Sequence, residues 1–256
     1  MLKRNEGLDI VKEVGGITSK EAALEIFRSA MDENHYHRIE TIKHTEILLK
    51  IANAIVMCEP SAVFVNTGSE EDRRFIRSLA LENGEEKALP MENHTIHYDL
   101  KDEQGRIIDR TYYIANEGEK ISSLANKMIR EEALSVIRDI MSGIMREKTM
   151  VIGFYIRGPA GAPVSNPALE ITSSAYVSHS AEILYRNAYA VFEKEVAARG
   201  HFYTNIHSEG LNRPEDLPNA RVFMDRSHWT TYSFNCTYAG NTLLLKKGNH
   251  RFSVDK

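Results

Sequence analysis

One segment, residues 150–156, constrains the fold more than any other part of the sequence. It reads Met-Val-Ile-Gly-Phe-Tyr-Ile, a continuous apolar run whose length and composition are typical of a strand. The run leads into Gly-Pro-Ala-Gly-Ala-Pro at residues 158–163, which holds too many glycines and prolines for a helix or a strand. Residues 168–172 are again largely apolar. The sequence therefore predicts two strands joined by a loop.

Helical and strand patterns follow one another along the rest of the chain. Thr18 begins Thr-Ser-Lys-Glu, a capping-box pattern that precedes a helix. Ser69 suits the N-cap of another helix, which has an acidic first turn and which Gly84 should end. Further helices are expected over 44–57, 121–145 and most of 177–199, and strands over 62–65, 95–98, 111–114, 202–206, 220–224 and 230–234. The predicted buried strand residues are Val63, Val65, Val151, Ile152, Phe154 and Ile171.

The mixed order of helices and strands predicts an α/β fold with a mixed sheet. No internal repeat, low-complexity tract or linker divides the sequence, so we expect a single domain over residues 1–256. Two free, buried thiols are expected at Cys58 and Cys236, because the two cysteines lie far apart and lack metal-ligand spacing.

Composition excludes several classes of function. The formal net charge is −4, from 32 basic and 36 acidic residues, so there is no basic excess for binding nucleic acid or an anionic membrane. No apolar run approaches the 18 residues or so that a transmembrane helix needs. The first residues are basic but lack the apolar region of a signal peptide. We therefore expect a cytoplasmic protein without nucleic-acid or membrane partners.

Taken singly, the polar motifs are weak signals. A Gly-Asn-Thr turn at residues 240–242 can present backbone N–H groups to an anion, and Lys246 and Lys247 follow it, although such a pair is more often a solvated surface feature. The loop 158–163 is no Walker A loop, and neither a Gly-Lys-Ser/Thr ending nor a dinucleotide fingerprint occurs in the sequence. In a strand, His94 and His97 point to opposite faces and cannot chelate one metal together.

Read together, these segments resemble the N-terminal domain of GTP-type phosphoenolpyruvate carboxykinases. The similar segments, from about Val63 to Lys247, are Gly68–Asp72, residues 149–163, Leu169–Val177, Ser233-Phe234, Tyr238–Thr242 and Lys246-Lys247. Ala239, in place of a second glycine, and residues 93–99 resemble the archaeal form of the family.

The resemblance implies a reversible carboxy-lyase reaction of gluconeogenesis. Oxaloacetate loses CO2, and the resulting enolate takes the γ-phosphoryl group of GTP to give phosphoenolpyruvate and GDP. A divalent metal, Mn2+ or Mg2+, lies beside the substrate in such enzymes, and a second accompanies the nucleotide. Metals and lysines suit this chemistry because negative charge develops on the enolate and phosphoryl oxygens.

The resemblance also assigns residues. Tyr238, Gly240 and Asn241 match a substrate-binding segment in which the glycine brings a backbone N–H to the substrate carboxylate. Lys246 matches a catalytic lysine that steadies the charge of the substrate. Lys247 matches a lysine that binds manganese, for which its amine must be neutral.

Arg106 matches an arginine that clamps a substrate carboxylate through its planar guanidinium group and takes part in catalysis. Arg110 is a close competitor, because Ile107 stands where the family usually has an aspartate. We expect Arg106, Tyr238, Gly240, Lys246 and Lys247 to converge on one open, basic face, although over 130 residues separate the first from the last.

The sequence departs from the family after Lys247. The family's phosphate-binding loop and its metal-binding histidine and aspartate come later in the chain, and His250 is too close to Lys247 to match that histidine. We therefore expect the chain to need a C-terminal nucleotide-binding part, on the same polypeptide or as a separate chain, and to be inactive alone. Two alternatives remain: a stand-alone carboxylate-binding or regulatory domain, and an unrelated α/β domain.

Overall fold

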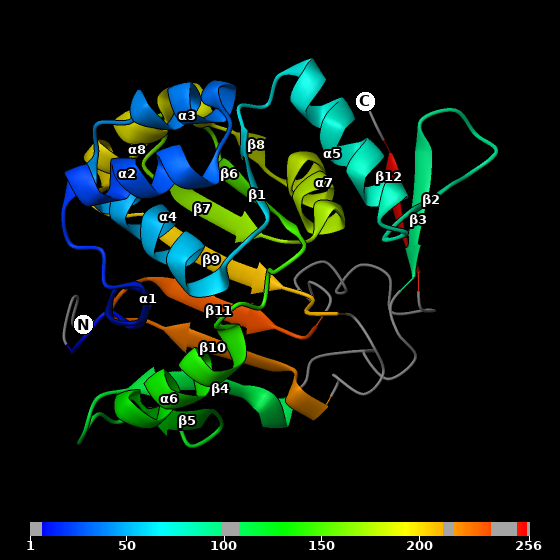
Figure 1. Cartoon of the computed structure of the whole chain (residues 1–256). Coiled ribbons are helices and arrows are strands. Elements are labelled where there is room, and N and C mark those ends of the chain that lie inside the picture. Colours follow the sequence, from blue (N-terminus) through cyan, green and yellow to red (C-terminus); the bar gives the residue numbers. More distant parts are fainter. Residues whose placement is uncertain (1–6, 99–107, 212–217, 237–249, 255–256) are drawn as a thin grey trace.

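The computed structural model describes residues 7–98, 108–211, 218–236 and 250–254. It has a mixed α/β fold, as predicted, with helices packed against a large mixed sheet (Figure 1). The strand order in the large sheet is β1-β6-β7-β9-β11-β10-β4-β5, and the short β8 pairs with β6 off this path. A smaller sheet has the order β12-β3-β2.

The bounds of the elements are as follows. The helices are α1 (Ile10–Gly15), α2 (Lys20–Ala30), α3 (Glu33–Glu40), α4 (Thr45–Cys58), α5 (Glu70–Glu82), α6 (Arg130–Met141), α7 (Ala175–Leu184) and α8 (Phe192–Arg199), with 3-10 turns at Ile108–Arg110 and Tyr189–Val191. The strands of the large sheet are β1 (Ala62–Asn66), β4 (Thr111–Ala115), β5 (Asn126–Ile129), β6 (Thr149–Arg157), β7 (Asn166–Thr172), β8 (Arg186–Asn187), β9 (Tyr203–Ser208), β10 (Arg221–Asp225) and β11 (Thr230–Phe234). Those of the small sheet are β2 (Lys87–Ala88), β3 (His94–Tyr98) and β12 (His250–Val254).

The strand directions distinguish two opposite edges of the large sheet, one where β7, β9 and β11 end and one where they begin. β7 and β9 are parallel, as are β9 and β11, so the carboxyl ends of these three strands lie at one edge, which we call the carboxyl edge. β6 runs antiparallel to β7 and therefore starts at this edge. We call the opposite edge, where β7, β9 and β11 begin, the amino edge. In Figure 1 the carboxyl edge faces right, toward α7 and the small sheet.

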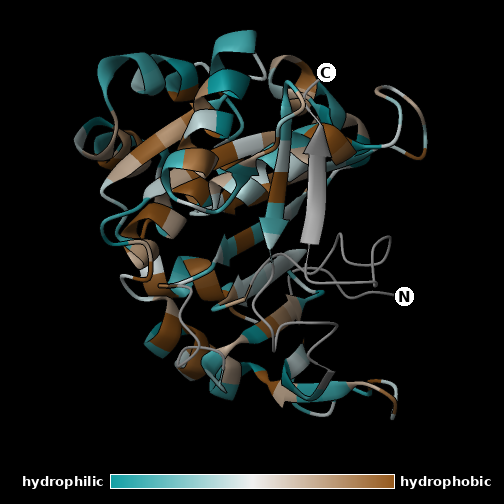
Figure 2. Ribbon diagram, turned by 90° about the vertical axis from the view of Figure 1, so that its right-hand side faces the viewer, coloured by the Kyte–Doolittle hydropathy of each residue, from teal (hydrophilic) through white to brown (hydrophobic). Residues whose placement is uncertain are grey.

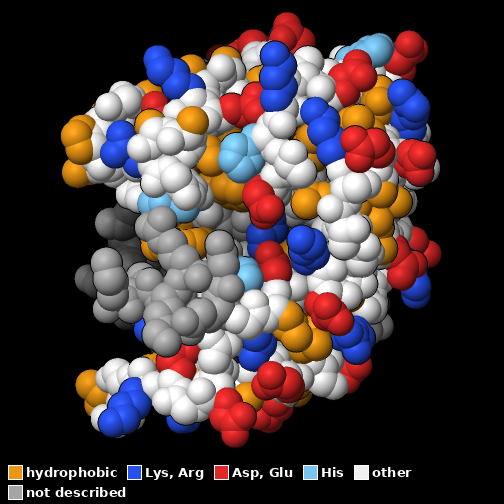
Figure 3. All heavy atoms as spheres, turned by 90° about the vertical axis from the view of Figure 1, so that its left-hand side faces the viewer, with side chains coloured by type: hydrophobic (Ala, Val, Ile, Leu, Met, Phe, Trp, Pro, Cys, Tyr) orange, Lys and Arg blue, Asp and Glu red, His pale blue; other side chains and the backbone are white. Residues whose placement is uncertain are grey.

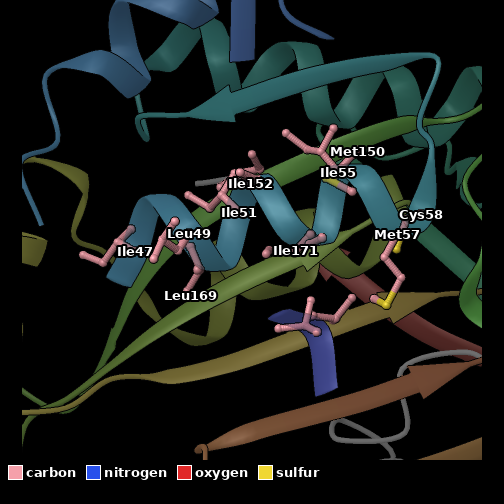
Figure 4. Packing of buried hydrophobic residues seen from close by; sticks show 14 of the residues in the cluster. Ile47, Leu49, Ile51, Ile55, Met57, Cys58, Met150, Ile152, Leu169 and Ile171 are labelled. Carbon is pink, nitrogen blue, oxygen red and sulfur yellow. The ribbon is translucent and has the colours of Figure 1, made fainter. Parts of the chain in front are cut away.

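The core is centred on α4 and the strands β6 and β7. The helix buries residues around most of its circumference, and Ile47, Ile51 and Ile55 lie against the layer that contains Ile152 and Leu169 (Figure 4). Burying one such side chain contributes about 1.5–3 kcal/mol before the entropy of ordering it is subtracted. The six strand residues predicted to be buried are at most 3% exposed, so that prediction is confirmed.

Two helix ends follow the sequence signals closely. Ser69 caps α5, because its Oγ accepts a hydrogen bond from the Asp72 N–H at 3.1 Å, and Gly84 adopts a positive φ of 72° two residues after the helix ends. For α2 the cap is Ser19 rather than Thr18, since the Ser19 Oγ accepts from the Ala22 N–H.

One predicted long helix is wrong in extent, whereas the prediction that most of 177–199 is helical is confirmed, with a break. Only residues 130–141 of the span 121–145 form α6, because residues 126–129 instead pair with β4 as strand β5. The span 177–199 contains α7 and α8, separated by β8, which pairs with β6, and by a 3-10 turn. In both places pairing with a distant strand overrides the local helical pattern.

Cys58 and Cys236 are both buried and free, as predicted. Among the described residues, none of the helices has the length and apolar character needed to cross a lipid bilayer.

Candidate functional site

The residues predicted from the sequence to bind substrate or metal lie outside the described residues. Arg106 falls in the span 99–107, and the span 237–249 contains Tyr238, Gly240, Asn241, Lys246 and Lys247. Their predicted convergence is therefore untested. The alternative clamp Arg110 is described: it ends a 3-10 turn directly before β4.

The described residues that flank these two spans are neighbours. Tyr98 precedes the first span, His250 follows the second, and these two residues are direct partners in the antiparallel pairing of β3 with β12. Cys236, which precedes the second span, comes just after β11 at the carboxyl edge. Figure 2 looks onto this side of the molecule. The sheet topology thus brings the borders of the two predicted segments to one side of the fold.

Ser174 joins two acidic side chains beside this edge. Its Oγ lies 2.6 Å from Glu85 Oε2 and 2.8 Å from Glu209 Oε1. A hydroxyl group has one hydrogen to donate, so one of the two carboxyl groups must be protonated and donate to Ser174. Glu85 already accepts from the Tyr176 N–H at 2.8 Å and behaves as the carboxylate, which leaves the proton on Glu209.

The electrostatics of Glu209 agree with this assignment. Its side chain is buried, and burial, followed by the nearby charge of Glu85, raises the pKa of Glu209 to about 7. His97, Ser174 and Lys148 oppose the shift but do not cancel it. The cluster therefore holds a proton that titrates close to neutral pH.

The small sheet is tied to this cluster through β3. The ring of His97 stacks on that of Tyr176 from α7, with centroids 3.7 Å apart and planes 2° from parallel. The His97 Nδ1–H donates to the Glu85 carbonyl oxygen at 2.6 Å. A buried pair of His179 and Glu86, 2.9 Å apart, adds a second link to α7. These contacts fix the strand that ends at Tyr98.

His207 fixes the chain as it leaves β11. Its Nε2 is 2.9 Å from the Cys236 carbonyl oxygen, which can only accept, so Nε2 carries the hydrogen. Its Nδ1 is then free to accept from the Thr172 hydroxyl at 2.8 Å. Burial lowers the pKa of His207 to about 4, which keeps the ring neutral and this tautomer in place.

A hollow of about 330 Å³ opens beside these groups. Its lining includes Glu85, Lys148, Ser173, Glu209 and Leu211. The Lys148 ammonium group donates to the Gly210 carbonyl oxygen, directly after Glu209. The hollow thus places a positive charge and an exchangeable proton side by side, an arrangement that can bind a carboxylate.

The described residues do not contain a group of three His, Cys, Asp or Glu side chains that could hold a metal ion. His94 and His97 hydrogen-bond to different carbonyl groups, those of Glu92 and Glu85, as expected for side chains on opposite faces of β3.

Sequence reasoning missed Glu85, His207 and Glu209, because none of them belongs to a recognisable motif. The sequence nevertheless contains one pattern that could have indicated His207 and Glu209. Residues 172–174 and 207–209 are polar and end predicted strands, and carboxyl ends of parallel strands meet at one edge. The parallel pairing of these strands could not be inferred from the sequence.

Comparisons with known proteins agree with the family resemblance of the sequence. The family model described as "Phosphoenolpyruvate carboxykinase N-terminal domain" matches residues 50–256. The chain is 37% identical over 238 residues to the phosphoenolpyruvate carboxykinase [GTP] of Pyrococcus furiosus, covering 91% of the chain and 38% of that protein. It is 33% identical over 235 residues to that of Saccharolobus solfataricus, covering 92% of the chain and 37% of the relative. A bacterial relative, from Corynebacterium jeikeium, is 27% identical over 218 residues, 80% of the chain and 36% of the relative. The chain thus spans under two fifths of the length of these curated relatives.

Proposed function

We propose, given that the chain belongs to the phosphoenolpyruvate carboxykinase N-terminal domain family, that it is the substrate-binding part of a GTP-dependent phosphoenolpyruvate carboxykinase. In this role it would bind oxaloacetate and phosphoenolpyruvate for the carboxy-lyase step of gluconeogenesis in the cytoplasm. Residues 1–256 would act as one domain.

The observation that carries the proposal is the pairing of Tyr98 with His250. It brings the borders of the spans 99–107 and 237–249 together, and these spans hold all the residues that the family resemblance assigns to the substrate. If the arginine and the lysine pair had no common function, the borders of their two spans would have no reason to lie together. The contacts of His97 and His207 hold both borders in place.

Within this site each residue has a distinct part. The guanidinium group of Arg106 clamps one carboxylate of oxaloacetate, and the Gly240 N–H binds to the substrate. Tyr238 and Asn241 complete the binding surface. Lys246 stabilises the negative charge that develops on the enolate oxygen after CO2 leaves.

For the metal, Lys247 is the donor that this chain would provide to Mn2+ or Mg2+, with its amine neutral. One amine does not make a metal site, and the described residues add no three-ligand group. We therefore assign no step of the reaction to a metal held by this chain alone.

GTP would bind to a C-terminal nucleotide-binding part, because the sequence has no Gly-Lys-Ser/Thr loop to hold its phosphates. A stand-alone carboxylate-binding or regulatory domain, which would bind the same substrate without turnover, is the second candidate. The two differ in whether adding a C-terminal nucleotide-binding part creates GTP-dependent turnover of oxaloacetate.

Titration of the chain with oxalate, a stable dicarboxylate related to oxaloacetate, tests the substrate site. We expect weak binding, roughly millimolar, by calorimetry or NMR. Arg106→Ala and Lys246→Ala should each weaken it, whereas Lys127→Ala, which removes an exposed charge from β5, should not. Loss of binding in Arg110→Ala but not in Arg106→Ala would assign the clamp to Arg110. Equal binding by all four variants would contradict the proposed site.

A further inference from the structure

A second hollow, of about 370 Å³, lies at the amino edge of the large sheet, where β9 and β11 begin. Its polar lining includes Asp9, His44, Lys50, His201 and His228, and Phe202 is part of its apolar lining. Figure 3 looks onto this side of the molecule, and acidic, basic and histidine side chains gather near the middle of the face. None of the residues assigned to oxaloacetate belongs to this lining.

The hydrogen bonds of two histidines define which ring nitrogen carries the hydrogen when the ring is neutral. The His201 Nδ1 lies 3.1 Å from the Arg199 carbonyl oxygen and must donate to it, so the neutral ring presents a lone pair at Nε2. This Nε2 is buried and lacks a hydrogen-bond partner among the described residues. The His228 Nε2 likewise donates to the Gly7 carbonyl oxygen at 3.0 Å, which leaves a lone pair at Nδ1, 3.7 Å from Asp9 Oδ2.

Asp9 offers a further acceptor. Its Oδ2 binds the Lys50 ammonium group at 2.6 Å, while its Oδ1 is buried with no hydrogen-bond partner in the described part of the chain. The Lys50 side chain is 8% exposed, and its ammonium group also donates to Thr230 Oγ1 at 3.0 Å. This ammonium group is therefore already hydrogen-bonded within the protein. Buried polar atoms without a hydrogen-bond partner are unfavourable, and a ligand that pairs with them removes this cost. The hollow thus presents two buried acceptors, Asp9 Oδ1 and the Nε2 of a neutral His201, beside the buried indole N–H of Trp229.

The charge of the lining also favours a cationic ligand. Asp9 and Glu46 carry two negative charges against one positive charge on Lys50, so the acidic and basic side chains of the lining sum to −1. The described residues do not bring three metal-binding groups close enough for one ion, so a bare metal does not fit. Phe202, whose ring meets the His44 ring edge-on at 6.1 Å, and Trp229 provide an apolar wall.

We propose that this hollow binds a small organic cation, an ammonium or amidinium group on a compact apolar body. Its N–H groups donate to Asp9 Oδ1 and His201 Nε2, and its apolar part packs against Phe202. An aromatic wall near a cation adds a favourable interaction with the ring faces. The volume suits a ligand larger than an ion and smaller than a nucleotide.

Four probes that share a benzene ring separate charge from shape: benzamidine, benzylamine, benzyl alcohol and benzoate. We expect the two cations to shift the backbone amide signals of Gly200 and Trp229 in two-dimensional NMR spectra of the chain, recorded without oxaloacetate or GTP. They should bind about tenfold more tightly than benzyl alcohol, and benzoate should not bind. Benzoate binding as tightly as benzamidine would overturn the proposal.

Variants locate the binding groups. Asp9→Asn and His201→Phe should each weaken benzamidine binding about fivefold or more, and Glu13→Gln, which removes an exposed charge near Asp9, should not. If Asp9→Asn does not fold, because Lys50 loses its partner, the half-buried His201→Phe decides the matter. Unchanged affinity in a folded His201→Phe variant would contradict the proposal and leave the oxaloacetate site unaffected.

Discussion

The two edges of the large sheet are both polar, but they differ in how their polar groups are satisfied. At the carboxyl edge, Ser174 bridges Glu85 and Glu209, and His207 is hydrogen-bonded through both of its nitrogens. At the amino edge, one oxygen of Asp9 and one nitrogen of His201 have no partner among the described residues. A closed network holds chain segments in place, whereas unpaired groups around a hollow are available to a ligand.

The largest expected effect is a loss of stability when Lys50, at the amino edge, is replaced. Lys50→Met leaves the largely buried Asp9 carboxylate without its ion partner, and we expect a loss of about 3–5 kcal/mol in the free energy of unfolding. Urea denaturation measures this loss. The control is Arg146→Met, which breaks a pair with Glu59 in which both side chains are well exposed and should cost at most about 1 kcal/mol. Similar losses in the two variants would mean that the amino edge is more hydrated than its burial indicates.

A variant of His207 tests the closed network. His207→Leu removes the partners of the Thr172 hydroxyl and the Cys236 carbonyl, so we expect a loss of about 2–3 kcal/mol. Oxalate binding should weaken as well, because Cys236 borders the span 237–249. The matched variant is His37→Leu, which alters an exposed ring on α3. A destabilised His207→Leu variant with unchanged oxalate affinity would show that the network supports the fold alone.

The proton on Glu209 gives a pH-dependent test. The folded-state pKa of Glu209, about 7, lies above its ordinary value of 4.5, so its contribution to stability is present at low pH and is lost as pH rises from about 4.5 to 7. Glu209→Gln keeps a hydrogen-bond donor without the titration. Its stability relative to the parent chain should therefore rise across this range, by about 1–3 kcal/mol. Thermal unfolding at a series of pH values measures the difference, and a difference that stays constant with pH would contradict the shared-proton assignment.

The smallest expected effect concerns the rim of the amino-edge hollow. Glu46 is exposed, so Glu46→Gln should weaken benzamidine binding only about twofold, and less at high salt. NMR titration at two salt concentrations detects such a change. An effect as large as that of Asp9→Asn would move the centre of the proposed site outward to Glu46.

The sequence was most informative where local chemistry decides the structure. The apolar run at 150–156 predicted β6, and the polar cap of α5 predicted a helix start at Ser69. It failed where distant pairing decides, as for residues 126–129, which form a strand only because β4 lies beside them. For the same reason the sequence did not show that Glu85, His207 and Glu209 lie together, because the order of the strands brings them to one place. The assignments of Arg106 and of the residues from Tyr238 to Lys247 came from family resemblance and stay predictions.

The pairing of β3 with β12 has a consequence for the order of folding. Tyr98 and His250 are far apart in sequence, so closing their contact costs more chain entropy than closing any hairpin in the large sheet. We therefore expect this contact to form late, after the local helices and the central strands have condensed. The side of the molecule on which we propose the substrate site would then form last, and a polypeptide emerging during synthesis could not complete the small sheet before residues 250–254 are available.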